Sequence, residues 1–441
     1  GETCLLECDD GKGVKLLRRA IRLDPNGSAL TYNQLAAGLL SQRRQADAID
    51  SGQSALALDP QLTEGYSNLG VALNETHETH KARTLLRRVL ILDPDHLDAK
   101  LNLANVLVEL RQWAEAEQLF DWVCRMNPGD AKPLWNKACL LLLLGRFREG
   151  WELYESRFRL AHLRGKIPNE NFPVWCGEPL QGKTILVRSE QGFGDTIQFS
   201  RFVKDLLDLG AHPIIEAPRV LHRLLSELDP AIKLIESTQQ NPIHADFEIS
   251  IMSLPWRLGL EIPKNGRPYL NSDSATYKGP LPATPGLRIG VAWSGNPRHH
   301  RDHERSIPFQ EFASLFDTGH QFFCLQKEVQ ATDRNAALEI SNLMLCSPWL
   351  ETFSDTAALI ESMDLIITVD TSISHLAGAL GKRTFTLLAY TPDFRWLLER
   401  TDTPWYESMQ LYRQSERGNW GPILQCIRNV LEETSGYNIR T

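Results

Sequence analysis

The chain has 441 residues, of which 42% are hydrophobic and 23% charged, and its formal net charge is -8. A chain of this length exceeds one compact core, so two or three domains are expected. The negative charge argues against nucleic-acid binding, which needs a basic surface. The eight cysteines form no CxxC pair and no zinc-finger spacing, which predicts reduced thiols in a cytoplasmic protein. No apolar run approaches a membrane span, and the start at Gly1 rather than Met leaves room for a removed leader or an upstream segment.

A proline preceded by Asp or Asn recurs through the first third of the chain, at Pro25, Pro60, Pro94 and Pro128, with intervals of 35, 34 and 34 residues. This period is typical of paired-helix repeats, in which small residues lie where two helices touch and proline ends the second helix. The residues at the other repeat positions are Tyr32, Leu35, Ala48 and Ala55, then Tyr66, Leu69, Gly70 and Ala82, then Leu103, Ala104, Ala116 and Phe120. From about residue 10 to residue 158 the pattern resembles the tetratricopeptide repeat.

A fourth unit, residues 134–158, ends in GRFREGWELYESRF. Its Gly150, Trp151 and Tyr154 fit the second helix of a repeat, whereas His162 stands where the pattern expects proline. We interpret this unit as a capping repeat that joins the next domain. Arrays of this kind present a concave groove to peptides or partner proteins, but a spacer or an oligomerisation surface would show the same pattern.

After a linker at residues 164–179, short apolar runs alternate with helical segments, which predicts parallel α/β structure. A second linker rich in Pro, Gly, Asn and Ser, residues 263–285, divides this part into two α/β domains. The predicted strands of the front domain are 184–187, 213–216, 232–235 and 247–251, with helices at 196–209 and 220–228. Those of the rear domain are 287–293, 321–325, 343–346, 365–369 and 384–388, with helices at 309–316, 333–342 and 422–432. The last helix could pack on either sheet.

The loop at residues 188–195, RSEQGFGD, follows the first strand of the front domain. Ligands of open α/β sheets bind at strand carboxyl ends. We expect Gly192 and Gly194 to let the backbone bend tightly beside a ligand. Asp195, at the start of the next helix, is either a helix-capping carboxylate or a general base at a cleft. The loop lacks the third glycine of a dinucleotide fingerprint, which argues against a nicotinamide-dependent oxidoreductase.

The loop at residues 294–306 follows the first strand of the rear domain, where Ser294, Gly295 and Asn296 offer a tight turn. Its three arginines could hold a phosphate or diphosphate through charge-assisted hydrogen bonds. Its three histidines could also bind a metal ion, but we rank a metal site below a phosphate site. The arginines would repel a cation, and the histidine spacing matches no standard zinc site. The arginines are Arg298, Arg301 and Arg305, and the histidines are His299, His300 and His303.

The stretch LIITVDTSISHLAGALG, residues 365–381, predicts a buried strand that ends at Asp370 and feeds a helix. Backbone N–H groups and the helix dipole at such a turn bind phosphates, although an ordinary turn capped by Ser372 would look the same. Thr371 and His375 belong to the same candidate site. A weaker candidate follows strand 321–325, where Gln326, Lys327 and Glu328 are either donor ligands or surface charges.

The motifs SEQGFGDTIQF, VAWSGNPRHHRDHERSIP, LQKE and VDTSISHLAGALGKRTFTLL occur in this order between about residues 180 and 435. They resemble the bacterial heptosyltransferase family, and most closely its tetratricopeptide-repeat-bearing branch, some members of which are implicated in glycosylating proteins such as flagellin. The resemblance implies two Rossmann-like domains in the B-type glycosyltransferase fold. It also implies inversion at the anomeric carbon without an obligatory metal, with the donor on the rear domain and the acceptor on the front one.

The resemblance also assigns roles to residues of this chain. Asp195 matches the catalytic aspartate, Arg305 stands where the lipopolysaccharide enzymes carry a phosphate-binding lysine, and Ser372 replaces a glycine of the phosphate-binding turn. The implied acceptor-side loop comprises Glu190, Gln191, Gly192 and Gly194. The implied donor site comprises Ser294, Gly295, Asn296, Arg305, Gln326, Lys327, Asp370, Thr371, Ser372 and His375.

We therefore expect an α plus α/β protein with a repeat α-solenoid at residues 1–158, an acceptor domain at 159–278 and a nucleotide-sugar domain at 279–441. The expected function is cytoplasmic, metal-independent transfer of a sugar from a nucleotide-sugar substrate, with no cofactor, to an acceptor protein or peptide recruited by the array. The alternative is a non-catalytic scaffold whose transferase-like half senses a nucleotide sugar. Neither a nucleic-acid partner nor a transmembrane segment is expected, and a homo-oligomer is possible.

Overall fold

The computed structural model describes residues 10–160, 172–236, 243–263, 265–283, 286–299 and 301–436. The chain forms two compact units, Gly1–Leu140 and Leu141–Thr441, and each is described by itself. The linkers predicted at residues 164–179 and 263–285 lie partly outside the described residues.

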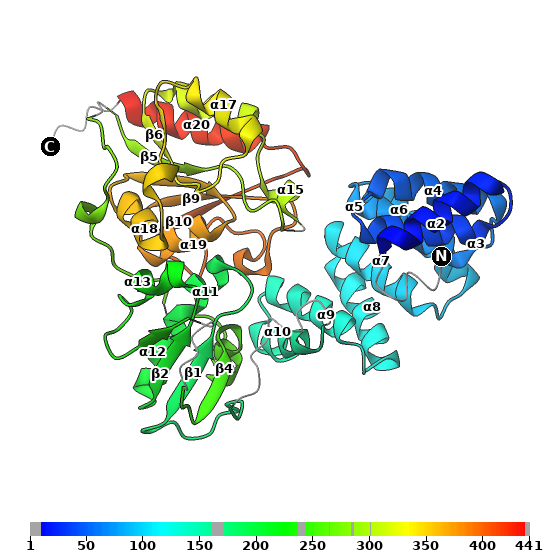
Figure 1. Cartoon of the computed structure of the whole chain (residues 1–441), viewed down its shortest axis with the longest axis horizontal. Helices are drawn as coiled ribbons and strands as arrows, with labels where there is room; N and C mark the ends of the chain where they lie inside the picture. Colours follow the sequence, from blue (N-terminus) through cyan, green and yellow to red (C-terminus); the bar gives the residue numbers. More distant parts are fainter. Residues whose placement is uncertain are drawn as a thin grey trace. The chain divides into compact units, whose positions relative to one another are not determined.

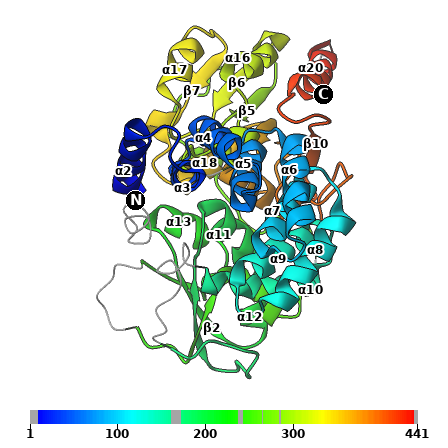
Figure 2. The ribbon, with the colours of Figure 1, turned by 90° about the vertical axis from the view of Figure 1, so that its right-hand side faces the viewer.

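The first unit is an array of helices of 13 or 14 residues, and from α2 to α8 each helix contacts the next (Figure 1). Alternate helices also contact each other, α3 with α5 and α5 with α7, so the first helices of successive repeats form one layer. Figure 2 shows the same helices, coloured blue to cyan, from another side. The helices are α2 (Asp10–Leu23), α3 (Ala29–Ser41), α4 (Gln45–Leu58), α5 (Thr63–Glu75), α6 (Thr79–Leu92), α7 (Leu97–Glu109), α8 (Trp113–Met126) and α9 (Ala131–Leu143).

Small residues stand where the helices of the array touch, as the repeat pattern predicts. A Cβ atom on Gly70 would lie 2.9 Å from Leu86 Cγ, and Ala48, Ala82 and Ala116 have no exposed surface. Interiors pack at the density of organic crystals, so a larger side chain at these positions would push the helices apart. The α-solenoid is therefore confirmed.

The second unit begins within the last turn of α9, and the helix that the capping motif predicts follows as α10 (Phe147–Tyr154), which a 3-10 helix, η1 (Glu155–Arg159), extends. A Cβ atom on Gly150 would lie 2.6 Å from Leu142 Cγ, so a small residue is required there too. Trp151 and Tyr154 are buried in this unit. His162 lies outside the described residues.

The front domain is a four-stranded parallel sheet in the order β3-β2-β1-β4. The strands are β1 (Thr184–Arg188), β2 (His212–Glu216), β3 (Lys233–Ile235) and β4 (Phe247–Ser250), and the helices are α11 (Phe193–Phe199), α12 (Val203–Asp208), α13 (His222–Leu225) and α14 (Leu254–Arg257). The single helix expected at 196–209 is two helices, because a 3-10 turn at Ser200–Phe202 interrupts it.

The rear domain is a six-stranded parallel sheet in the order β10-β9-β8-β5-β6-β7. Its strands are β5 (Arg288–Ala292), β6 (Gln321–Cys324), β7 (Leu343–Leu345), β8 (Leu365–Val369), β9 (Thr384–Leu388) and β10 (Met409–Arg413). Its helices are α15 (Asp302–Arg305), α16 (Phe309–Phe312), α17 (Ala331–Leu338), α18 (Phe353–Glu361), α19 (Ser372–Ala379) and α20 (Gly421–Gly436). Two parallel-sheet α/β domains are confirmed, while β10, α14, α15 and α18 were not predicted.

The final helix, α20, packs on the rear sheet. Leu424, Ile427 and Leu431 belong to the same buried cluster as Ile289 of β5 and Phe322 of β6. This contact settles the alternative that the sequence left open. Within the described ranges, no helix combines the length and the apolar character that crossing a bilayer requires.

Each sheet reverses its strand order once, and the predicted site loops lie at these reversals. In the front sheet the reversal is between β1 and β4, and in the rear sheet it is between β5 and β8. Ligands of doubly wound sheets bind at the carboxyl ends of the strands at such points. The loops that follow β1, β5 and β8 are those singled out in the sequence. Helices α11 and α19, which leave the β1 and β8 loops, contact each other where the two domains meet (Figure 1).

Candidate active site

Asp195 of the front domain faces the rear domain. It is the third residue of α11, and its Oδ2 accepts a hydrogen bond of 2.8 Å from the N–H of Gly192, which caps the helix. Its Oδ1 accepts a hydrogen bond from Arg395 Nη2 of the rear domain. One oxygen of the carboxylate therefore fixes the helix start and the other joins the two domains. Asp195 is therefore both a helix-capping residue and a residue of the domain junction.

Arg395 is the centre of this junction, and the sequence analysis missed it. Besides Asp195, its guanidinium donates to Asp393 Oδ1 at 2.7 Å and to Gln198 Oε1 at 2.6 Å. Only 6% of the residue is exposed. Arg395 lies in TPDFRW, shortly after β9, so the same rule of strand carboxyl ends that located the other loops could have found it.

The pKa values of Asp195 and Asp393 shift in opposite directions. Burial raises the pKa of Asp195, and the Arg395 guanidinium and the Gly192 N–H oppose part of that rise. Burial also acts to raise the pKa of Asp393, but Arg395 outweighs it and the net pKa is lowered. Asp195 is therefore the more basic carboxylate of the two.

The turn after β8 is built as a helix N-terminus. Thr371 is the N-cap, and its Oγ1 accepts a hydrogen bond of 3.3 Å from the N–H of Ile373. The alternative interpretation, in which Ser372 caps the helix, is wrong about the residue, because the chain is already helical at Ser372 and the extended residue is Thr371. Burial, and next the charge of Asp393, raise the pKa of Asp370 to about 6.

His375 is a buried neutral imidazole. Its ring stacks on Trp396 with the centroids 5.4 Å apart, and Nδ1 lies 3.0 Å from the hydroxyl of Tyr406. Burial, and next the charge of Arg395, lower the pKa of His375 to about 3. A neutral imidazole adds no positive charge for a phosphate and contributes hydrogen bonding and stacking instead.

The β1 loop takes its shape from different residues than expected. Neither Gly192, with φ of -108°, nor Gly194 has a left-handed backbone, and Gln191 adopts φ of 59° instead. Gly194 is needed for space: a Cβ there would lie 2.9 Å from Cδ2 of His375. The prediction that both glycines supply a tight bend is wrong, because Gly194 serves the close approach of α11 to α19.

Arg305 brings the β5 and β8 loops together. It donates from Nη1 to the carbonyl of Asp370 at 3.0 Å and from Nε to Asp302 Oδ1 at 3.1 Å. A Cβ on Gly295 would lie 2.6 Å from its Nη2, so Gly295 leaves room for the guanidinium. The side chain is partly exposed. Arg305 and the N-terminus of α19 therefore lie together at the edge of the rear sheet, where the guanidinium is a cation and the helix presents the positive end of its dipole.

The remaining predicted donor residues divide into buried and exposed ones. Gln326 is buried; its Oε1 accepts from the N–H of Trp293 at 2.8 Å and its Nε2 donates to Ser294 Oγ at 2.9 Å, so it fixes the end of β5. Asn296 and Lys327 are exposed, and Lys327 Nζ lies 3.3 Å from the carbonyl of Ser347. The other exposed candidate side chains of these loops are Arg298, His299, His303 and Glu328, and His300 lies outside the described residues.

Two family models match the chain. The tetratricopeptide repeat matches residues 73–132, and glycosyltransferase family 9 (heptosyltransferase) matches residues 314–427. The chain carries a family 9 glycosyltransferase domain behind a tetratricopeptide-repeat array. The family 9 match includes the turn after β8 and Arg395. It starts at residue 314, after the β1 and β5 loops, and so includes neither.

A relative and several solved structures are similar to parts of the chain. Protein FlbA of Caulobacter vibrioides is 27% identical over 328 residues, which are 66% of this chain and 53% of FlbA. The chain thus spans about half the length of the curated relative that it matches. The crystal structure of MamA covers 38% of this chain and 97% of its own at 20% identity, with a TM-score of 0.31. A thermophilic repeat protein of Thermus thermophilus covers 37% and 88% at 20% identity, with a TM-score of 0.33.

The repeat array carries a column of carboxamides that the sequence analysis did not single out. Asn33, Asn68, Asn102 and Asn136 recur at intervals of 35, 34 and 34 residues, one on the first helix of each repeat. Each of the last three donates through Nδ2 to the first helix of the preceding repeat: Asn68 to Asn33 Oδ1 at 2.8 Å, Asn102 to Ser67 Oγ at 3.3 Å, and Asn136 to Asn105 Oδ1 at 2.9 Å. The period of the repeats was the signal that could have revealed the column.

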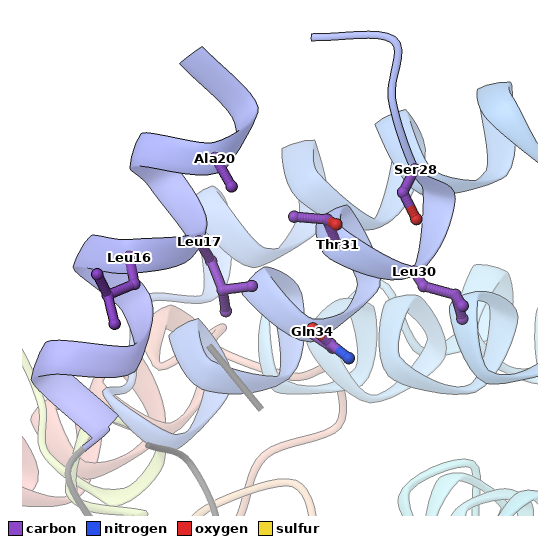
Figure 3. Close-up of a pocket in the computed structure, with 7 residues that line it drawn as sticks. All are labelled: Leu16, Leu17, Ala20, Ser28, Leu30, Thr31 and Gln34. Carbon is purple, nitrogen blue, oxygen red and sulfur yellow. The ribbon is translucent and has the colours of Figure 1, made fainter. Parts of the chain in front are cut away.

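A hollow of about 400 Å³ lies between α2 and α3 at the start of the array (Figure 3). It is lined by Leu16, Leu17, Ala20, Ser28, Leu30, Thr31 and Gln34. Its lining contains none of the predicted site residues.

Proposed function

We propose that the chain is an inverting glycosyltransferase that moves a sugar from a nucleotide-sugar donor to an acceptor hydroxyl. The observation that carries the proposal is the position of Asp195, whose carboxylate lies at the domain junction against Arg395. The loop of Asp195 also approaches α19, since Gly194 packs against His375. A base on one lobe that faces a phosphate-binding turn on the other is the arrangement that the transfer requires.

In the proposed reaction, the acceptor oxygen forms a bond to the anomeric carbon as the bond from that carbon to the nucleotide's phosphate oxygen breaks. The hydroxyl proton passes to the carboxylate of Asp195, and the leaving diphosphate keeps the electron pair of the broken bond. Arg305 and the N-terminal N–H groups of α19, beside Thr371 and Ser372, stabilise the negative charge that develops on the diphosphate. Since Arg305 supplies a fixed cation, the proposed mechanism requires no metal and no cofactor.

We further propose that the array recruits a protein acceptor along the column of asparagines. A side-chain carboxamide can donate to a main-chain carbonyl and accept from a main-chain N–H, so a row of them suits an extended peptide of varied sequence. Among the described residues, the thiols of Cys124, Cys176, Cys324, Cys346 and Cys426 are free, which supports a reducing, cytoplasmic setting.

A second candidate function is that of a scaffold that senses a nucleotide sugar without turning it over. One observation favours it: both oxygens of Asp195 already accept hydrogen bonds within the chain, from Gly192 and Arg395. A carboxylate oxygen has two lone pairs, so this bonding still leaves room for an acceptor hydroxyl, and we prefer the enzyme.

A panel of nucleotide sugars and free nucleotides tests the proposal, with thermal shift as the binding readout and nucleotide release as the activity readout. A ligand that binds only the folded state raises the melting temperature with the logarithm of its concentration. We expect at least one nucleotide sugar to stabilise the protein and to be turned over. Stabilisation without turnover, in the presence of acceptor proteins, would favour the scaffold, and no stabilisation by any nucleotide would reject both functions.

A further inference from the structure

The capping motif GRFREGWELYESRF is not used by the proposed chemistry, yet it holds the loop that carries Asp195. Arg157, in η1, has no exposed surface. Its Nε and Nη2 donate to the two oxygens of Glu190 at 3.0 and 2.7 Å, a bidentate pair with the β1 loop. Such planar pairing fixes orientation as well as distance.

The other N–H groups of Arg157 are also occupied. Nη2 donates to Ser253 Oγ at 2.8 Å, and Nη1 donates to Glu155 Oε1 at 2.8 Å and to the carbonyl of Tyr154 at 3.1 Å. All five donors of the guanidinium therefore have partners. A buried charge with complete hydrogen bonding has one favourable geometry, so Arg157 is a rigid anchor for Glu190.

The residue next to Glu190 is held by the same segment. Gln191 Nε2 donates to the hydroxyl of Tyr154 at 3.0 Å, and Gln191 adopts a left-handed backbone that is unfavourable for a residue with a Cβ. A strained residue keeps its conformation only where its surroundings hold it. Arg157 and Tyr154 thus fix two consecutive residues of the loop that leads to Asp195.

The same segment also contacts the loop of Arg395. The ring of Phe394 lies edge-on to Trp151 and to Tyr154, with centroid distances of 5.7 and 5.8 Å. The next residue, Arg395, donates to Asp195. The segment from Trp151 to Arg157 therefore supports both halves of the pair between Asp195 and Arg395.

We propose that Arg157 and Tyr154 are positioning residues of the transferase, which set the β1 loop and through it the orientation of Asp195. The capping motif is then a part of the catalytic half and not a spacer. The activity readout of this inference rests on the proposed function, but its structural readout does not.

The variants Arg157→Lys and Tyr154→Phe test the inference, with Arg159→Gln as the matched control, because Arg159 is exposed in the same 3-10 helix. Lys keeps the charge but loses the bidentate pair, and Phe keeps the ring but loses the hydroxyl that holds Gln191. Hydrogen–deuterium exchange of residues 190–196 reports the loop directly. Steady-state kinetics with the donor found in the nucleotide panel report its consequence.

We expect faster exchange of residues 190–196 in both variants. We also expect Arg157→Lys to lower kcat by about 100-fold with little change in the KM for the donor, since misplacing a catalytic group by about 1 Å costs that much. Arg159→Gln should change neither. If Arg157→Lys does not fold, the hydrogen–deuterium exchange of residues 190–196 in Tyr154→Phe tests the inference instead. Unchanged exchange in Tyr154→Phe, or equal changes in Arg159→Gln, would overturn the inference. Faster exchange in a protein that transfers no sugar would uphold the positioning and reject only the proposed function.

Discussion

Replacing Arg395 by alanine removes the cation at the domain junction. The guanidinium bonds to Asp195, to Asp393 and to the carboxamide of Gln198, and the side chain is buried. Breaking a buried ion pair by removing one partner costs about 3–5 kcal/mol, because the other charge is left without compensation. The variant leaves two carboxylates in this position, so we expect a loss of this size in the free energy of unfolding.

The assay is scanning calorimetry of the full chain, which separates transitions of a protein with several domains. With about 2.1 cal/mol/K of unfolding entropy per residue, such a loss lowers the melting temperature of the 301-residue transferase half by about 5–8 °C. The matched control is Arg400→Ala, which removes an exposed pair with Asp402 whose closest contact is 2.7 Å. Exposed pairs contribute about 0–1 kcal/mol, so the control should lower the melting temperature by less than about 2 °C. Equal decreases in melting temperature in Arg395→Ala and Arg400→Ala would refute the claim that Arg395 forms a buried, stabilising ion pair.

Three further predictions concern Arg305 at the proposed donor site, the titration of Asp370, and the asparagine column of the repeat array. Arg305→Ala should weaken nucleotide binding by about tenfold or more in calorimetric titration, because a charge-assisted bond to phosphate is lost; unchanged affinity would reject Arg305 as a phosphate ligand. Asp370 has a raised pKa in the folded state, so the folded state binds more protons than the unfolded state between about pH 4 and 6. The stability that protonated Asp370 contributes is therefore lost as the pH rises through that window. Asp370→Asn should therefore make stability rise more steeply with pH there than in the wild type, and an identical slope in pH-dependent melts would contradict the shift. Asn68→Ala should raise the KM for a protein acceptor but not for a small glycoside, unlike Gln53→Ala on the exposed face of α4; equal effects would reject the asparagine column.

The parts of the fold that could be predicted are those encoded by local patterns. Strands β8 and β9 begin and end where expected, because runs of β-branched and apolar residues buried on both faces leave little ambiguity. The repeat helices follow from their period. The strand at Met409–Arg413 was missed because it is an edge strand with partly exposed residues, and its short alternating pattern resembles a loop.

The site divides along the same line. The loops after β1, β5 and β8 were found because strand carboxyl ends can be located in a sequence. The partner of Asp195 was not found, since Arg395 lies 200 residues away and no local pattern encodes a contact over that separation. The left-handed backbone at Gln191 was missed for a related reason: its side chain bonds to Tyr154, which lies 37 residues earlier in the chain.

The most direct test of the account is the transfer rate of Asp195→Asn, measured beside its nucleotide affinity and beside Asp208→Asn, an exposed aspartate on α12. Asparagine can still accept the N–H of Gly192 but cannot take a proton from an acceptor hydroxyl. The account predicts that transfer falls by about 100-fold or more while nucleotide affinity stays within about twofold, and that Asp208→Asn changes neither. Full transfer activity in Asp195→Asn would contradict the account.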